Sequence, residues 1–246
     1  MLIAVFADMH ANRQAFAACL AQARDLGAER NVLLGDYVGY GADPEWTVAT
    51  VMDMVDKGAM AVRGNHDDAV ANSRERLNVD AAVAIEWTRG ELGTAERRFL
   101  EELPLTCADD DRLYVHADAS SPASWRYVTG VAAAARSMIA APVPITLCGH
   151  THRPALYTVS ATGKVTAFTP VTGCAIHLLP TRRWLAVLGS VGQPRDGNPA
   201  ASYLMLDTKR RELTYCRAPY DVAEAAARIR NKGLPIWLAD RLAMGR

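Results

Sequence analysis

The chain has 246 residues, half of them hydrophobic, so it can bury a sizeable core and is not intrinsically disordered. Lys and Arg together number 27, as do Asp and Glu, so the formal net charge is zero. A general attraction to nucleic acid or to an anionic membrane is therefore not expected. The five cysteines are widely spaced and form no CxxC pair, which favours reduced thiols over disulfides or a zinc ribbon.

The N-terminal apolar run, LIAVFA, is shorter than the hydrophobic region of a signal peptide. No stretch of the chain approaches the ~20 apolar residues that a membrane helix needs. The sequence therefore predicts a cytoplasmic protein that does not enter a membrane. It gives no indication of the oligomeric state.

The first part of the chain alternates short apolar strands with helices. LIAVFA (2–7) has the pattern of a strand buried on both faces, and residues 13–28 have helical spacing. NVLLGD (31–36) is a second strand, Pro44 opens a second helix, and MAVRGNHDD (60–68) passes from a third strand into a loop. This rhythm is typical of βαβ units and predicts an α/β fold.

The second part of the chain is richer in strands. Residues 79–103 have a helical pattern, after which RLYVHAD (112–118) and PITLCGHTH (144–152) are strands that end in histidine. Six short β-like pieces follow between residues 155 and 218, and the last ~25 residues return to helix. Because no repeat or long linker divides the chain, we expect a single domain over residues 1–246.

Metal-binding side chains gather at the predicted strand ends, where ligand groups collect in open α/β sheets. Five of the six histidines lie there with carboxylate and amide side chains: Asp8, His10, Asp36, Asn65, His66, Asp67, His116, His150 and His152. An ordinary polar loop at GHTH (149–152) would not explain why the histidines cluster at the strand ends. Imidazole and carboxylate ligands suit Mn, Fe, Zn or Co. The number of ligands is too large for one tetrahedral ion and suits two ions that share a bridging carboxylate.

The motifs that carry these residues resemble those of the calcineurin-like metallophosphoesterases, whose signature is DxH, GDxxxxG, GNH[DE], H and GHTH. All five blocks occur in order, between Asp8 and His152. GSVGQPRDGNPAASY (189–203) also resembles a motif of a bacterial subgroup that includes predicted phosphodiesterases and relatives of diadenosine tetraphosphate hydrolases. The resemblance implies a four-layer αββα sandwich, in which two mixed β-sheets pack face to face with helices outside.

The resemblance also implies the metal ligands. The first ion would be held by Asp8, His10, Asp36 and His152. Asp36 would bridge to the second ion, whose remaining ligands would be Asn65, His116 and His150. A hydroxide between the two ions would attack phosphorus in line with the leaving group. Manganese is the expected metal, with Fe, Zn, Ni and Co as alternatives that such a site also accepts.

Five residues are expected to contact the substrate or to support a side chain that does. By the same resemblance, His66, on a loop, would contact a phosphoryl oxygen or protonate the leaving oxygen, and Asp67 would hold its imidazole in position. Asn65 and Asn12 would also border the substrate. Arg195 would lie near the substrate phosphate, although the segment QPRDG equally fits an ordinary Pro/Gly-rich turn.

Two positions depart from the commonest family pattern. Ala11 stands where the first block usually has glycine, and a Cβ there would tighten the loop. The segment HADAS after the fourth block places Ala117 and Asp118 beside His116. We expect Asp118 to bring a negative charge near the second metal and to disfavour highly anionic substrates.

The sequence therefore predicts a dinuclear phosphoesterase that acts on a small-molecule phosphoester, with phosphodiesters preferred because of the subgroup resemblance. A phosphomonoesterase or a dinucleoside polyphosphate hydrolase are the alternatives within enzymes. The alternative from another class is a non-catalytic scaffold, because this fold also serves as one. Since every ligand position and His66 are filled, the enzyme is favoured.

Overall fold

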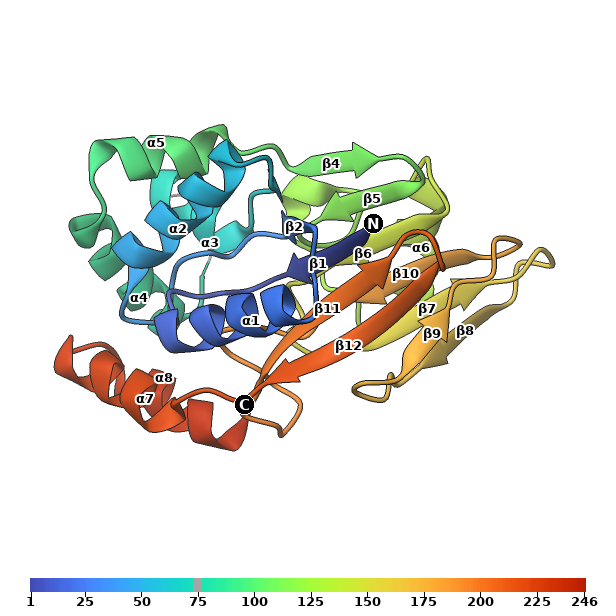
Figure 1. Cartoon of the computed structure of the whole chain (residues 1–246). Coiled ribbons are helices and arrows are strands. Elements are labelled where there is room, and N and C mark those ends of the chain that lie inside the picture. The colour runs from blue at the N-terminus through green and yellow to red at the C-terminus, as the bar shows by residue number, and fades with distance from the viewer. Residues whose placement is uncertain (73–76) are drawn as a thin grey trace.

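A computed structural model describes residues 1–72 and 77–246 (Figure 1). The first sheet has the order β3-β2-β1-β11-β12-β9, with β1 (Leu2–Phe6), β2 (Arg30–Leu33), β3 (Met60–Ala61), β9 (Ala175–His177), β11 (Ala201–Asp207) and β12 (Glu212–Ala218). The second has the order β4-β5-β6-β10-β7-β8, with β4 (Thr106–Asp109), β5 (Arg112–Val115), β6 (Ile145–Cys148), β7 (Ala155–Val159), β8 (Val165–Phe168) and β10 (Arg183–Val187). Each sheet contains parallel and antiparallel pairs, so both are mixed as predicted.

Helices cover the outer faces of both sheets. On the first sheet these are α1 (Arg13–Asp25), α2 (Pro44–Asp56), α3 (Asn65–Ala71) and α5 (Thr94–Glu102), and on the second it is α6 (Val131–Ala140). At one end, α4 (Val79–Glu91) packs against the C-terminal hairpin of α7 (Val222–Asn231) and α8 (Ile236–Met244). A short 3-10 helix between β5 and α6 spans Pro122–Ser124. The four-layer αββα architecture is thus confirmed (Figure 1). Among the described residues, every helix is too short or too polar to span a bilayer.

The central strands are apolar on both sides because both faces of the sheet are covered. In β1, Ile3 and Val5 point into the core between the two sheets, whereas Ala4 and Phe6 point toward α1 and its neighbours. All four side chains are fully buried. The alternation follows from the two-residue period of a strand, and it explains why LIAVF contains no polar residue.

The structure differs from the predicted elements in three places. The helical segment 79–103 is two helices, because the chain is extended at Leu92 and Gly93 before α5 begins. His66 lies on the first turn of α3 and not on a loop, since Gly64 caps a helix whose first turn carries two acidic residues. The prediction also missed β4, a short strand that pairs antiparallel with β5, and α6.

Truncation of a side chain between the sheets should destabilise the protein strongly. Leu204, in β11, is fully buried in this core, so Leu204→Ala removes packed methyl groups and leaves a cavity. We expect a loss of about 2–5 kcal/mol in the free energy of unfolding, measured by urea denaturation. Ile139→Ala on α6 is the control, because Ile139 is 82% exposed and should change stability by less than ~0.5 kcal/mol. Equal effects of the two substitutions would contradict this view of the core.

Candidate metal centre

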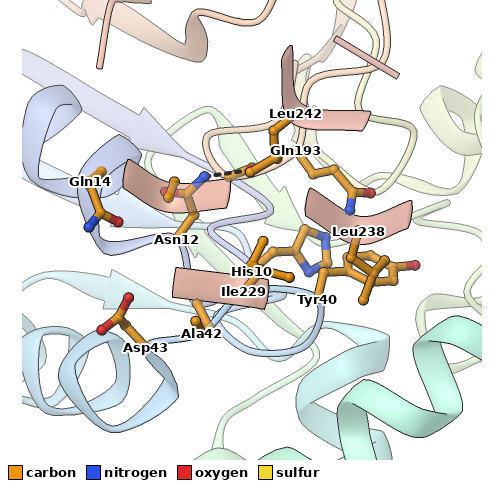
Figure 2. A pocket seen from close by; sticks show the side chains of 14 residues that line it. His10, Asn12, Gln14, Tyr40, Ala42, Asp43, Gln193, Ile229, Leu238 and Leu242 are labelled. Atoms are coloured by element: carbon orange, nitrogen blue, oxygen red, sulfur yellow. Dashed lines mark hydrogen bonds between the residues drawn. The ribbon is translucent and has the colours of Figure 1, made fainter. Parts of the chain in front are cut away.

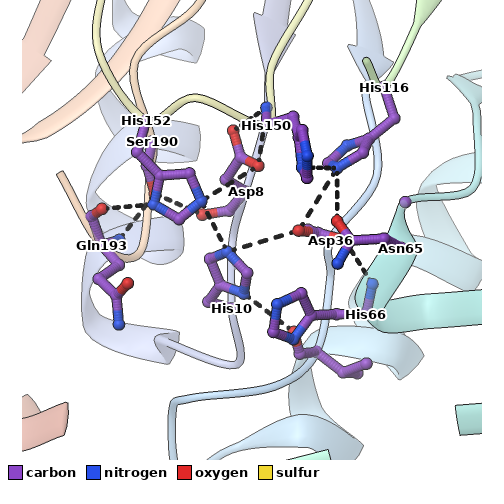
Figure 3. A network of polar contacts seen from close by, with 12 residues as sticks. Asp8, His10, Asp36, Asn65, His66, His116, His150, His152, Ser190 and Gln193 are labelled. Atoms are coloured by element: carbon purple, nitrogen blue, oxygen red, sulfur yellow. Dashed lines mark hydrogen bonds and ion pairs between the residues drawn. The ribbon is translucent and has the colours of Figure 1, made fainter. Parts of the chain in front are cut away.

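The residues that were predicted to bind metal converge at one end of the two sheets (Figure 3). They leave the carboxyl ends of β1, β2, β5 and β6, and Asn65 comes from the start of α3. Five of them adopt the left-handed backbone conformation, which non-glycine residues rarely take: Asp8, His10, Asp36, His150 and His152. Such backbone geometry costs about 1–3 kcal/mol a residue and clusters at functional sites. The backbone conformation of these loops therefore serves to direct the candidate ligand side chains toward one another.

The first ligand group consists of Asp8, His10, Asp36 and His152, all buried, with one potential ligand atom from each within 4.8 Å of the others. The Nε2 atoms of His10 and His152 lie 3.0 Å apart. Asp8 Oδ1 lies 3.4 Å from Nε2 of His152, and Asp36 Oδ2 lies 3.7 Å from Nε2 of His10.

The second ligand group consists of Asp36, His116 and His150. Nε2 of His116 lies 3.1 Å from Nδ1 of His150, 3.2 Å from Oδ1 of Asn65 and 3.4 Å from Oδ2 of Asp36. The same Asp36 oxygen thus faces both groups, which is the position that a bridging carboxylate needs. The structure brings together all seven residues that the motifs assigned to metal.

Each of the four histidines in these groups uses its other ring nitrogen to hold a backbone carbonyl. The partners are Val38 for His10, Leu34 for His116, Trp125 for His150 and Gln193 for His152, at 2.7 to 3.0 Å. A carbonyl can only accept, so the ring nitrogen that faces it carries the hydrogen. The remaining nitrogen of each ring faces the ligand group. Metal-bound histidines are oriented in this way in proteins, by outer hydrogen bonds that fix the tautomer.

The electrostatics of the site fit a divalent cation. Burial lowers the pKa values of His10 and His152 well below the ordinary range, so both rings are neutral and turn lone pairs toward each other across 3.0 Å. A bound cation would relieve that repulsion. Burial also acts to lower the pKa of His116, but the charges of Asp36 and Asp8 and the hydrogen bonds to Asp36 and Leu34 together outweigh it and raise this pKa to about 9. A proton on His116 thus compensates Asp36 when no metal is bound.

The ring of His66 is held by packing. It lies beside the rings of His10 and Tyr40, with centroids 4.8 and 4.5 Å away, and its buried Nδ1 has no hydrogen-bond partner among residues 1–72 and 77–246. Gly39 lies so close that a Cβ there would be 2.3 Å from Nδ1 of His66. The ring is therefore positioned by packing next to the ligand groups and keeps its hydrogen-bonding capacity.

The expected contact between Asp67 and the His66 ring is wrong. Asp67 accepts hydrogen bonds from the backbone N–H groups of Asp36, Tyr37 and Gly64, at 2.7 to 2.9 Å. Burial and the charge of Asp36 raise the pKa of Asp67 to about 8, although these hydrogen bonds oppose the shift. Asp67 is therefore a positioning residue that ties the loop after β2 to the start of α3.

Asn12 also departs from its predicted role. Its Oδ1 accepts the N–H of Ala15 and caps α1, while its Nδ2 donates to the carbonyl of Gly192 and to the hydroxyl of Tyr220. Asn12 lines a small cavity beneath α7 and α8, not the pocket that opens onto both ligand groups (Figure 2). The amide of Asn12 thus forms its hydrogen bonds within the protein and not with a substrate.

The C-terminal hairpin packs against the two loops that carry His10, after β1, and Tyr40, after β2. Ile229, Leu238 and Leu242 line the small cavity together with His10 and Tyr40 (Figure 2). The hairpin is fastened by Arg228, whose Nε donates to Oδ2 of Asp43 at 2.8 Å. No local sequence pattern predicts this contact, because it joins residues that are 185 positions apart.

A solvent-open pocket of about 680 Å³ exposes the ligand groups to substrate. We call it the metal pocket, and its lining includes Asp36, Asn65, His66, His150, His152, Tyr40, Trp125, Tyr127 and Arg195. Arg195 thus borders the ligand groups, as the functional reading of QPRDG predicted. Its guanidinium lies 5.8 Å from the ring centroid of Tyr40 and donates to Oε1 of Gln193. Tyr40 and Tyr127 were missed because only the fold brings their loops to the site.

The predicted effect of Asp118 is wrong as well. The Asp118 side chain is fully buried, its oxygens accept from the N–H of Ser120 and from the guanidinium of Arg136, and it does not line the metal pocket. These hydrogen bonds and the charge of Arg136 overcome the effect of burial and lower its pKa. Its negative charge is therefore balanced within the fold. Ala11, with φ of 50°, takes the left-handed conformation that glycine would supply at this position.

Comparison with known proteins identifies the family. The model of the calcineurin-like phosphoesterase superfamily domain matches residues 1–211. The chain belongs to this superfamily. An uncharacterized protein of Methanocaldococcus jannaschii is 32% identical to the chain over 251 residues, covering 100% of this chain and 98% of that protein. The membership inferred from the motifs is thus confirmed, and family and ligand groups together indicate a metal-dependent phosphoester hydrolase.

Two solved structures share the whole architecture of this phosphoesterase. A metallophosphoesterase from Sphaerobacter thermophilus is 33% identical, with a TM-score of 0.86 and full coverage of both chains. A hypothetical protein from Pyrococcus horikoshii has a TM-score of 0.80 at 17% identity, covering 100% of this chain and 98% of that one. At that identity the second likeness shows the fold alone. The coverage includes α7 and α8, which lie beyond the matched family model.

Substitution of Gly64 should disrupt the metal centre. A Cβ at this position would lie 2.2 Å from Oδ1 of Asp36 and 2.3 Å from its backbone nitrogen, so the shared carboxylate must move. We expect Gly64→Ala to weaken Mn²⁺ binding by at least about tenfold, measured by isothermal titration calorimetry. Gly90→Ala is the matched control, because Gly90 faces open space within α4. It should leave binding unchanged and stabilise the protein by up to ~1 kcal/mol.

Metal affinity should rise with pH. Because the pKa of His116 is about 9 without metal, this ring is protonated at pH 7 and must lose its proton to become a ligand. The affinity should therefore increase by up to about tenfold for each pH unit between 7 and 8, with release of at least one proton. Titration calorimetry in two buffers of different ionisation enthalpy counts the protons. A heat of binding that is independent of the buffer at pH 7 would contradict the charge on His116.

Proposed function

We propose that the protein is a dinuclear metal-dependent phosphodiesterase that acts on a small-molecule substrate. The observation that carries this proposal is the sharing of Asp36 by two buried His/Asp groups, with His66 beside them in one pocket. Neither group contains a thiolate. Imidazole and carboxylate ligands favour Mn²⁺ over an iron–sulfur cluster, and the same ligands can also bind Fe, Zn, Ni and Co.

Asp8, His10, Asp36 and His152 would hold the first ion, and Asp36, Asn65, His116 and His150 the second. Such a pair of ions supplies positive charge that polarises the phosphoryl oxygens and lowers the pKa of water. The protein's part is to fix these ligands. The backbone carbonyls behind the four histidines and the backbone N–H of His150, which donates to Asp8, do so.

His66 is suited to bind a phosphoryl oxygen. Burial lowers the pKa of its ring, so at neutral pH the ring is uncharged and donates a hydrogen bond without giving up a proton. This favours the substrate-contacting role over protonation of the leaving oxygen. Arg195, on the same pocket wall, adds a positive charge that would stabilise the negative phosphoryl group.

The shape of the metal pocket supports a diester. Aromatic side chains from Tyr40, Trp125 and Tyr127 border the open pocket, so a second esterified group would have apolar contacts beside the phosphate. Arg195 is the one arginine in its lining among the described residues. Beyond the two proposed metal ions, this one guanidinium suits the single charge of a diester phosphate, whereas a monoester presents a dianion.

The proposal is tested with metal-stripped protein assayed on bis-p-nitrophenyl phosphate and p-nitrophenyl phosphate, with and without Mn²⁺. We expect hydrolysis that depends on added metal, a higher kcat/KM for the diester, and a loss of at least about a hundredfold in Asp36→Asn. The matched control is Asp240→Asn, an exposed residue of α8 that pairs with Arg230 far from the ligand groups.

His66→Asn should lower kcat while leaving the stoichiometry of bound metal at two, because His66 is not placed as a ligand. Retained hydrolysis in Asp36→Asn would overturn the metal mechanism. Two bound ions without turnover of either ester would favour the scaffold alternative, and faster hydrolysis of the monoester would favour a phosphomonoesterase.

A further inference from the structure

A second pocket adjoins the metal pocket. This side pocket has a volume of about 870 Å³, is open to solvent, and is lined by residues that include Tyr127, Thr129, Thr151, Arg153, Tyr157 and Arg195. Tyr127 and Arg195 belong to both linings, so the two pockets meet at these side chains. A molecule bound at the ligand groups can therefore extend past Tyr127 and Arg195 into the side pocket.

The charge of the side pocket is positive and uncompensated. Its lining within residues 1–72 and 77–246 contains two arginines and no Asp or Glu. Nε of Arg153 donates to the carbonyl of Arg195 at 2.7 Å, and Arg195 donates to Oε1 of Gln193 at 2.8 Å. Both partners are neutral. Arg112, Arg211 and Arg217, by contrast, each pair with an aspartate.

The boundary between the pockets also offers an aromatic face. Tyr127 stacks on His150, with ring centroids 4.1 Å apart and planes inclined by 15°, yet 51% of its surface is exposed. Tyr157 contributes a second, buried ring to the lining. Thr151 lies in the same lining, and its buried hydroxyl has no hydrogen-bond partner among the described residues. Planar rings, a hydroxyl and the guanidinium groups of two arginines in one lining match a ligand with a flat base and an anion.

We propose that the side pocket binds a nucleotide portion of the substrate, with a second phosphate contacting Arg153 while the scissile diester lies at the ligand groups. This inference rests on the proposed function and specifies its substrate class. Arg195 is shared between the two phosphates, since it lines both pockets. Arg153 lines the side pocket alone, so it selects the second phosphate without belonging to the metal pocket.

The test compares two thymidine dinucleotides that differ by one phosphate, TpT and its 5′-phosphorylated form pTpT, as substrates of the Mn²⁺-loaded protein. We expect kcat/KM to be about tenfold higher for pTpT, and Arg153→Gln to abolish most of this preference through KM, because a charged hydrogen bond is lost. Arg126→Gln is the matched control. It removes an exposed arginine of the same loop as Tyr127 that lines neither pocket, and it should keep the preference.

The failure of this inference differs from the failure of the proposed function. If bis-p-nitrophenyl phosphate is hydrolysed but TpT and pTpT react alike, or Arg153→Gln retains the preference, the nucleotide pocket is wrong and the diesterase stands. If no ester is hydrolysed, the proposed function fails. Titration calorimetry of both dinucleotides then decides the pocket: tighter binding of pTpT that Arg153→Gln removes supports it, and equal binding overturns it.

Discussion

The burial of a dense set of polar ligands at the ends of two sheets is the constraint on which the rest of the structure depends. Two aspartates and four histidines, each at most 6% exposed, face one another there. Unpaired, such groups would cost several kcal/mol each. The fold offsets this cost through backbone carbonyls behind the histidines, a charge balance between His116 and Asp36, and a donor set that suits cations.

This constraint also explains the shape of the connecting loops. A ring can turn one nitrogen to a carbonyl and the other to its neighbours only if its backbone is placed correctly, and at His10, His150 and His152 the backbone is left-handed. The glycines around it permit close approach where side chains would collide, as Gly192 does against the carbonyl of Met9 and Gly41 against that of His10. The residues of the motifs thus set the backbone conformation of the loops as well as supplying the ligands.

Much of this could be predicted from the sequence, because strand ends, histidines and glycines occur in a fixed order along the chain. The α/β class and the gathering of Asp8, Asp36 and His150 followed from that order, and the four layers followed from the family resemblance. The helical position of His66 did not, since GNHD suits a turn and a helix start equally well. The roles of Asp67, Asn12 and Asp118 depend on partners from distant segments, which no local pattern reveals.

The side chain of Asp67 has a consequence for how this chain can vary. By accepting the N–H groups of Asp36, Tyr37 and Gly64, one carboxylate fixes the relative register of two loops that are about 30 residues apart in sequence. An insertion or deletion in either loop would separate the donors from the acceptor. The lengths of the two loops are therefore fixed, and the surface turns between β7 and β9 are where added residues would be accommodated instead.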